Sequence, residues 1–166
     1  MNITRVFIHG LEGSSHGTKG RFFRQRYPDM IIEDFRGPLE QRMDKLNTQL
    51  ADRTSLIMVG SSFGGLMATI FASKNPRRVK KLILLAPALA LPGFDSYLRH
   101  RIGMPVLIYH GKRDDVVPMA PVHETAQRVF ESVTFNMVDD DHVLSQTFKS
   151  MDWDNLLETQ SALTPP

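Results

Sequence analysis

Cysteine is absent from this chain of 166 residues. A disulfide framework, a thiolate zinc site and a cysteine nucleophile are therefore excluded. No apolar run approaches the roughly 20 residues that a membrane-spanning helix needs. The first residues also lack the basic and then apolar layout of a signal peptide. These absences predict a cytoplasmic protein without a membrane span.

The sequence also has little excess charge of either sign. Its 20 lysines and arginines face 18 aspartates and glutamates, which leaves a net charge of +2. Two extra charges are too few to indicate nucleic-acid binding. With 42% hydrophobic residues the chain can build a core. We expect one domain over residues 1–163 and a frayed tail at 164–166, and no feature indicates an oligomeric state.

Short apolar runs alternate with helical patterns along the chain. Runs of this kind are typical of parallel strands that are covered on both faces. The six runs span residues 6–8, 30–32, 56–59, 82–85, 106–109 and 133–138. The last run alternates with polar residues and the second is followed by two acids, so both are expected at sheet edges. The alternation predicts a doubly wound parallel α/β sheet.

Between these runs, apolar residues recur at spacings of three and four, which predicts helices over residues 39–50 and 122–130. Residues 63–72 are apolar almost all round, so this segment is expected to form a buried central helix that ends at Asn75-Pro76.

The third run is followed by a motif that points to nucleophilic chemistry. Gly60-Ser61-Ser62-Phe63-Gly64 matches the nucleophile elbow, in which a sharp strand-to-helix turn exposes the central serine. The serine is held in a strained conformation, and glycines at 60 and 64 avoid clashes around the turn. Ser62 is therefore the candidate nucleophile, with Ser61 as its neighbour.

A serine hydroxyl needs a base, and that base needs an orienting acid. Asp114 follows the fifth run and His142 follows the sixth, which matches the expected chain order of serine, acid and histidine. Asp115 competes with Asp114 as the acid. Three further aspartates, at 139–141, are expected to be loop caps or solvated charges.

The loop after the first run is expected to supply half of an oxyanion hole. Backbone N–H groups of Leu11 and Phe63 would hold the negative oxygen of a tetrahedral intermediate. His9 is expected to be a buried, hydrogen-bonded residue that shapes this loop. Glu12 adds a charge nearby, whose direction the sequence leaves open.

Other motifs fail on inspection. Glycines at 10, 13, 17 and 20 form a glycine-rich loop, but their spacing does not match a dinucleotide-binding fingerprint. Thr18-Lys19-Gly20 is not the end of a phosphate loop, and His123 lacks the second histidine of a zinc-protease helix. We expect no metal and no cofactor.

Together these residues resemble the α/β-hydrolase superfamily, and most closely its small, lidless YqiA-type bacterial esterases. The matching segments are His9-Gly10-Leu11, Gly60 to Gly65, His110 to Pro118 and Asp141-His142. The resemblance implies ester hydrolysis through an acyl-enzyme, with Ser62 as nucleophile, His142 as base and Asp114 as acid. Without the two leading strands of a full-length member, it implies a truncated α/β/α sandwich with a six-stranded sheet in the order 2-1-3-4-5-6.

The sequence therefore predicts a serine hydrolase that cleaves small carboxylic esters. A short cap segment at 88–103 is expected to line the substrate pocket, through Leu89, Leu91, Phe94 and Leu98. One alternative is an acyl-coenzyme A thioesterase or acyltransferase, with phosphates attracted by Arg99, His100 and Arg101. Another is a catalytically silent interaction module that keeps the fold.

Overall fold

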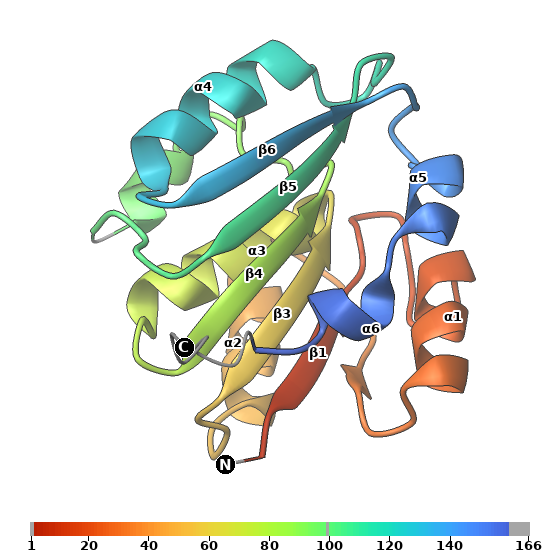
Figure 1. Ribbon diagram of the computed structural model, residues 1–166. Coiled ribbons are helices and arrows are strands. Elements are labelled where there is room, and N and C mark those ends of the chain that lie inside the picture. Colours follow the sequence, from red (N-terminus) through yellow and green to blue (C-terminus); the bar gives the residue numbers. More distant parts are fainter. Residues whose placement is uncertain (1, 99, 160–166) are drawn as a thin grey trace, which may run out of the picture.

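The computed structural model describes residues 2–98 and 100–159. Six parallel strands form one sheet in the order β2-β1-β3-β4-β5-β6, with helices on both faces (Figure 1). The strands are β1 (Thr4–Ile8), β2 (Ile31–Ile32), β3 (Leu56–Ser61), β4 (Val79–Leu85), β5 (Val106–Gly111) and β6 (Val133–Val138). The predicted fold and strand order are confirmed, with β2 and β6 at the edges.

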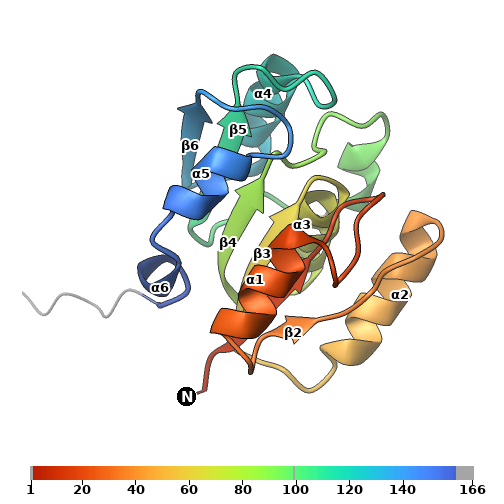
Figure 2. The same ribbon diagram turned by 90° about the vertical axis from the view of Figure 1, so that its right-hand side faces the viewer.

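The helices form the two outer layers of the sandwich. One layer contains α2, α3 and α4, and the other contains α1, α5 and α6 (Figure 2). Their bounds are α1 (Thr18–Arg26), α2 (Leu39–Gln49), α3 (Phe63–Lys74), α4 (Met119–Val129), α5 (Ser145–Ser150) and α6 (Trp153–Leu156), with a short 3₁₀ helix, η1 (Phe94–Tyr97). No helix in the described ranges is long and apolar enough to cross a bilayer.

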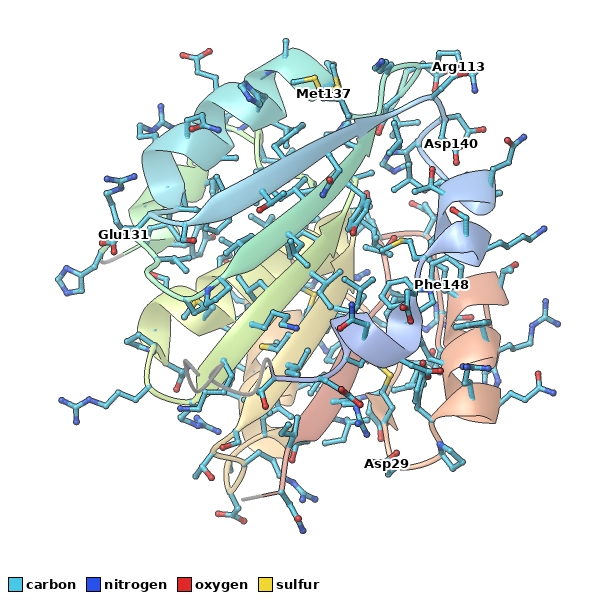
Figure 3. The ribbon with its side chains drawn as sticks, in the orientation of Figure 1. Asp29, Arg113, Glu131, Met137, Asp140 and Phe148 are labelled. Atoms are coloured by element: carbon cyan, nitrogen blue, oxygen red, sulfur yellow. The ribbon has the colours of Figure 1, made fainter. Side chains whose placement is uncertain are left out.

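Each face of the sheet has its own apolar core. On the first face, α3 is buried from residue 64 to 73 and ends at Asn75, as the sequence predicts. On the second face, the ring of Phe23 on α1 meets those of Phe7, Phe148 and Trp153 at centroid distances of 4.8–5.4 Å. This aromatic cluster joins the first helix to the last two, and Phe148 lies between α5 and the sheet in Figure 3.

Because all strands are parallel, their carboxyl ends lie together at one end of the sheet. Arg113 and Asp140 lie at that end in Figure 3, while Asp29 lies at the opposite end. The loops after β1, β3, β5 and β6 gather there, which is where a doubly wound sheet binds its ligands.

Candidate active site

Ser62 lies on the turn between β3 and α3. Its backbone has φ 53° and ψ −114°, the strained conformation expected of a nucleophile elbow. A Cβ on Gly60 would lie 2.5 Å from the carbonyl oxygen of Gly64, and one on Gly64 would lie 2.1 Å from that of Ile8. Both glycines are therefore required, although the second clash is with strand β1 rather than across the turn.

The structure brings Ser62, Asp114 and His142 together from three separate loops. His142 Nδ1 lies 2.7 Å from Asp114 Oδ2, and its Nε2 lies 3.1 Å from Ser62 Oγ. An ionised carboxylate can only accept hydrogen bonds, so Nδ1 carries the proton and the Nε2 lone pair faces the serine hydroxyl. In this arrangement the imidazole can accept the serine proton.

Asp114 is held in a fixed orientation inside the protein. Its side chain is fully buried, and Oδ1 accepts from the N–H groups of Val116 at 2.9 Å and Val117 at 2.7 Å. Oδ2 accepts from His142. Asp115, the competing acid, is exposed.

The three aspartates before His142 have the roles that the sequence predicts. Asp139 pairs with Arg113 at 3.5 Å on the surface. Asp140 accepts from the N–H and hydroxyl groups of Thr147, and Asp141 accepts from the N–H groups of residues 143 and 144. These carboxylates shape the loop that carries His142.

A second histidine, His110, touches the same carboxylate and was missed by sequence reasoning. It is fully buried, with Nε2 lying 2.8 Å from the carbonyl oxygen of Val117 and 3.2 Å from Asp114 Oδ2. Burial, more than any other cause, lowers the pKa of His110. The neutral ring then donates its Nε2 proton toward both oxygens. The feature of the sequence that could have revealed His110 is its position, directly at the end of the strand that precedes Asp114.

The loop after β1, which is predicted to supply half of the oxyanion hole, is shaped by His9. Its Nε2 accepts from the N–H of Phe35 at 2.9 Å, so Nδ1 carries the proton and donates to the carbonyl oxygen of Gly10 at 2.7 Å. Burial lowers the pKa of His9, which favours this neutral form. The N–H of Gly13 also donates to the Gly10 oxygen, at 3.1 Å. Because the peptide is planar, a fixed Gly10 carbonyl also fixes the direction of the Leu11 N–H.

Arg42 on α2 contacts both residues predicted to form the oxyanion hole. Its Nη2 donates to the carbonyl oxygen of Leu11 at 3.2 Å, and its guanidinium lies 5.3 Å from the ring centroid of Phe63. Only 4% of Arg42 is exposed, and no carboxylate in the described ranges lies within ion-pairing distance. Burial lowers its pKa, and the exposed Glu12 partly offsets this through its charge. Glu12 thus acts on the Arg42 side of the loop.

The cap segment is tied to the helices on either side. The two carboxylate oxygens of Asp95 each lie 3.1 Å from Arg128 Nη2 on α4, and the hydroxyl of Tyr97 donates to Glu40 on α2 at 3.1 Å. Arg101 donates to the carbonyl oxygen of Phe130 at 2.8 Å. Arg99 lies outside the described residues, as does the predicted tail at 164–166.

The four predicted pocket residues occupy different surroundings. Leu89 and Phe94 are buried in the core, Leu98 is partly buried against it, and Leu91 is exposed. Their assignment to a substrate pocket stays a prediction.

A cavity of about 180 Å³ lies elsewhere, beside the elbow. It is lined by Phe7, by most residues of the segment 9–20, by Ser61 and by Val143, the residue after His142. All four glycines of the glycine-rich loop line it, whereas none of the predicted pocket residues does. In the part of the chain that the structure describes, no group of three or more acidic or histidine side chains could hold a metal ion.

Residues 13–97 match the model of the alpha/beta hydrolase fold family. The chain belongs to this family. Among solved structures, the α/β hydrolase chain is similar to a YdeN-like hydrolase from Pectobacterium atrosepticum, with a TM-score of 0.73 and 20% identity over 95% of this chain and 90% of that one. It is also similar to an alpha-beta serine hydrolase homologue from Coxiella burnetii, with a TM-score of 0.74 and 18% identity over 95% and 85%.

Sequence similarity to curated proteins covers a shorter stretch of this α/β hydrolase. A homoserine O-acetyltransferase from Thermus thermophilus is 36% identical over 67 residues, which are 40% of this chain and 16% of that protein. The matches thus span about a sixth of the length of the curated relatives. The fold supports hydrolase activity in general, and the YqiA-type resemblance is consistent with neighbours of similar size.

Proposed function

We propose that this protein is a serine hydrolase that cleaves small carboxylic esters through an acyl-enzyme. The observation that carries the proposal is the continuous chain of hydrogen bonds from Asp114 through His142 to Ser62 Oγ. Serine, aspartate and histidine follow one another in the order expected of a triad. The base lies 3.1 Å from a hydroxyl on a strained turn, and this is the arrangement that activates a serine.

In the proposed reaction, Ser62 Oγ attacks the ester carbonyl while His142 Nε2 takes its proton. The carbonyl oxygen becomes negative and accepts from the N–H groups of Leu11 and Phe63, which donate to no acceptor among the described residues. The bond to the alcohol breaks, and the imidazolium returns its proton to the leaving oxygen. A water molecule, deprotonated by His142, then attacks the acyl-enzyme and releases the acid and free Ser62.

Acyl transfer is the second candidate, because a homoserine O-acetyltransferase is among the relatives. The same acyl-enzyme would then pass its acyl group to an alcohol instead of water. Within the cap, Arg101 donates to the carbonyl oxygens of Gln127 and Phe130, which engages a guanidinium that would otherwise attract the phosphates of coenzyme A. Hydrolysis is therefore the preferred proposal.

A fluorophosphonate probe tests the proposal without knowledge of the natural substrate. We expect wild-type protein to be labelled, and Ser62→Ala to lose both labelling and ester hydrolysis, by on the order of 10⁴-fold or more. Ser61→Ala is the control, and labelling should persist in it. Labelling that depends on Ser61 instead of Ser62 would show that the elbow register is wrong, and an unlabelled wild type would contradict the proposal.

A further inference from the structure

The cavity beside the elbow has a polarity that the ester proposal does not use. Among the residues that line it, Lys19 is the only one with a charged side chain. His9 is neutral, and no acidic residue lines the cavity. Three hydroxyl-bearing residues, Ser14, Thr18 and Ser61, also line it. The lining therefore contains one cationic residue and three residues that carry a hydroxyl group.

Lys19 is held at this cavity by contacts that leave part of its ammonium group available. Its Nζ donates one proton to the carbonyl oxygen of Val143 at 2.6 Å and lies 5.5 Å from the ring centroid of Phe148. An ammonium group has three protons, so two remain for a ligand. No carboxylate of the described ranges lies within 4.0 Å of Nζ.

The acidic residues near Lys19 do not accept a hydrogen bond from its ammonium group. Asp140 and Asp141 act on it through their charges, but their carboxylates accept hydrogen bonds from the loop that carries His142. Burial, the larger effect, lowers the pKa of Lys19. An anion bound in the cavity would offset this loss of hydration. Glu12 is exposed and does not line the cavity.

The cavity lies next to the turn that carries Ser62. A Cβ on Gly10, which lines the cavity, would lie 3.4 Å from the Cβ of Ser62. Ser61 and Val143, which also line it, are the chain neighbours of Ser62 and His142, although the lining includes neither Ser62 nor His142. This proximity is the reason to consider the cavity as a substrate subsite.

The volume is sufficient for a small group. A cavity of roughly 150 Å³ accommodates a six-membered ring, so this solvent-open cavity of about 180 Å³ has room for a short chain that ends in a carboxylate. We propose that the substrates are small esters that carry a carboxylate, and that Lys19 binds this carboxylate beside Ser62. This inference rests on the proposed function and narrows its substrate class.

The test compares pairs of esters in which one member ends in a carboxylate and the other in an alkyl group, with proton release as the measure of hydrolysis. Monomethyl succinate against methyl butyrate places the carboxylate on the acyl half. Butyryloxyacetate against propyl butyrate places it on the alcohol half. We expect the wild type to have a higher kcat/KM for the charged member of one pair, and that pair identifies the half that enters the cavity.

Three variants assign the preference to Lys19. Lys19→Gln keeps a donor for Val143 but removes the charge, and should lower the charged-to-neutral ratio of kcat/KM about ten- to a hundredfold, the effect of one hydrogen bond to a charged group. Lys19→Arg should keep most of the ratio. Lys45→Gln is the matched control, because Lys45 also donates to a carbonyl oxygen and lies 5.7 Å from a phenylalanine ring, yet does not line the cavity.

A purely structural role of Lys19 would slow both members of a pair equally and leave the ratio unchanged, which overturns the inference. A wild-type ratio near one in both pairs also overturns it. Fluorophosphonate labelling separates this failure from that of the proposed function: labelled protein without a charge preference contradicts only the carboxylate subsite, whereas unlabelled protein contradicts serine hydrolysis itself.

Discussion

Arg42 carries a positive charge into the interior without a carboxylate beside it. An isolated charge is costly to bury, and replacing buried charges by apolar side chains of similar volume is often neutral or stabilising. Arg42 Nε donates to the carbonyl oxygen of Gly37 at 2.8 Å, and its other contacts are with Leu11 and Phe63, the two residues that we propose form the oxyanion hole. We infer that Arg42 positions these two residues.

Replacement of Arg42 should therefore lower activity without lowering stability. We expect Arg42→Met to melt at or near the wild-type temperature, while kcat for ester hydrolysis falls by up to about 10²-fold, the lower end of the cost of losing one oxyanion donor. KM should change much less, because alignment of the Leu11 N–H matters most in the transition state. Thermal melts and steady-state kinetics on the same preparation measure both quantities.

Lys80→Met serves as the control, since Lys80 is exposed and lies on β4, away from the loops that carry the site. A variant of Arg42 that unfolds, or that raises KM alone, would contradict a positioning role.

The contacts of Arg42 and His110 could not be predicted from the sequence. Both edge strands, the buried helix α3 and the elbow were predicted because each depends on local apolar periodicity or on a short motif. The strand order was predicted only through the resemblance to the α/β-hydrolase superfamily. The side chain of Arg42 reaches Leu11 across 31 positions, and no periodicity encodes that contact. His110 lies at a predictable strand end, yet its contact with Asp114 depends on how the following loop folds back.

At the scale of elements, the cap and the glycine-rich loop differ in what they contribute to the core and to the cavity. The cap residues Leu89 and Phe94 are part of the core, so they are less available for an acyl chain. The glycine-rich loop, which matches no nucleotide-binding pattern, curves around the cavity instead. Whether a loop encloses space depends on its three-dimensional path, which composition alone does not specify.

The size of this cavity predicts a narrow range of neutral substrates. Each buried methylene adds about 0.8 kcal/mol until the available space is filled. We expect kcat/KM on p-nitrophenyl esters to peak at acyl chains of about two to six carbons and to fall for longer ones. A series of esters with increasing chain length measures this profile, and a profile that still rises at long chains would reveal a deep acyl tunnel.

For the whole molecule, two buried histidines link stability to pH. Burial lowers the pKa of both His9 and His110, so the folded protein binds fewer protons at these sites than the unfolded chain does. Their contribution to stability is present above the ordinary histidine pKa and is lost as the pH falls below it. The relevant window opens near pH 6.5 and extends downward.

We therefore expect the melting temperature to fall between about pH 7 and about pH 5, before most carboxylates protonate. His9→Gln should flatten this dependence, because the substituted residue does not titrate. His100→Gln, which changes an exposed histidine, should leave the slope unchanged. An equal slope in all three proteins would show that other groups determine the pH dependence.

The aromatic cluster between α1 and the last two helices affects how the chain folds during synthesis. Phe23 emerges from the ribosome about 130 residues before Trp153, at roughly 5–20 residues per second. Until α5 and α6 follow, α1 is the one helix of its layer that is available to cover the second face of the sheet. The single tryptophan of the chain lies in this cluster and is 3% exposed, so its fluorescence reports the packing of α6 against that face.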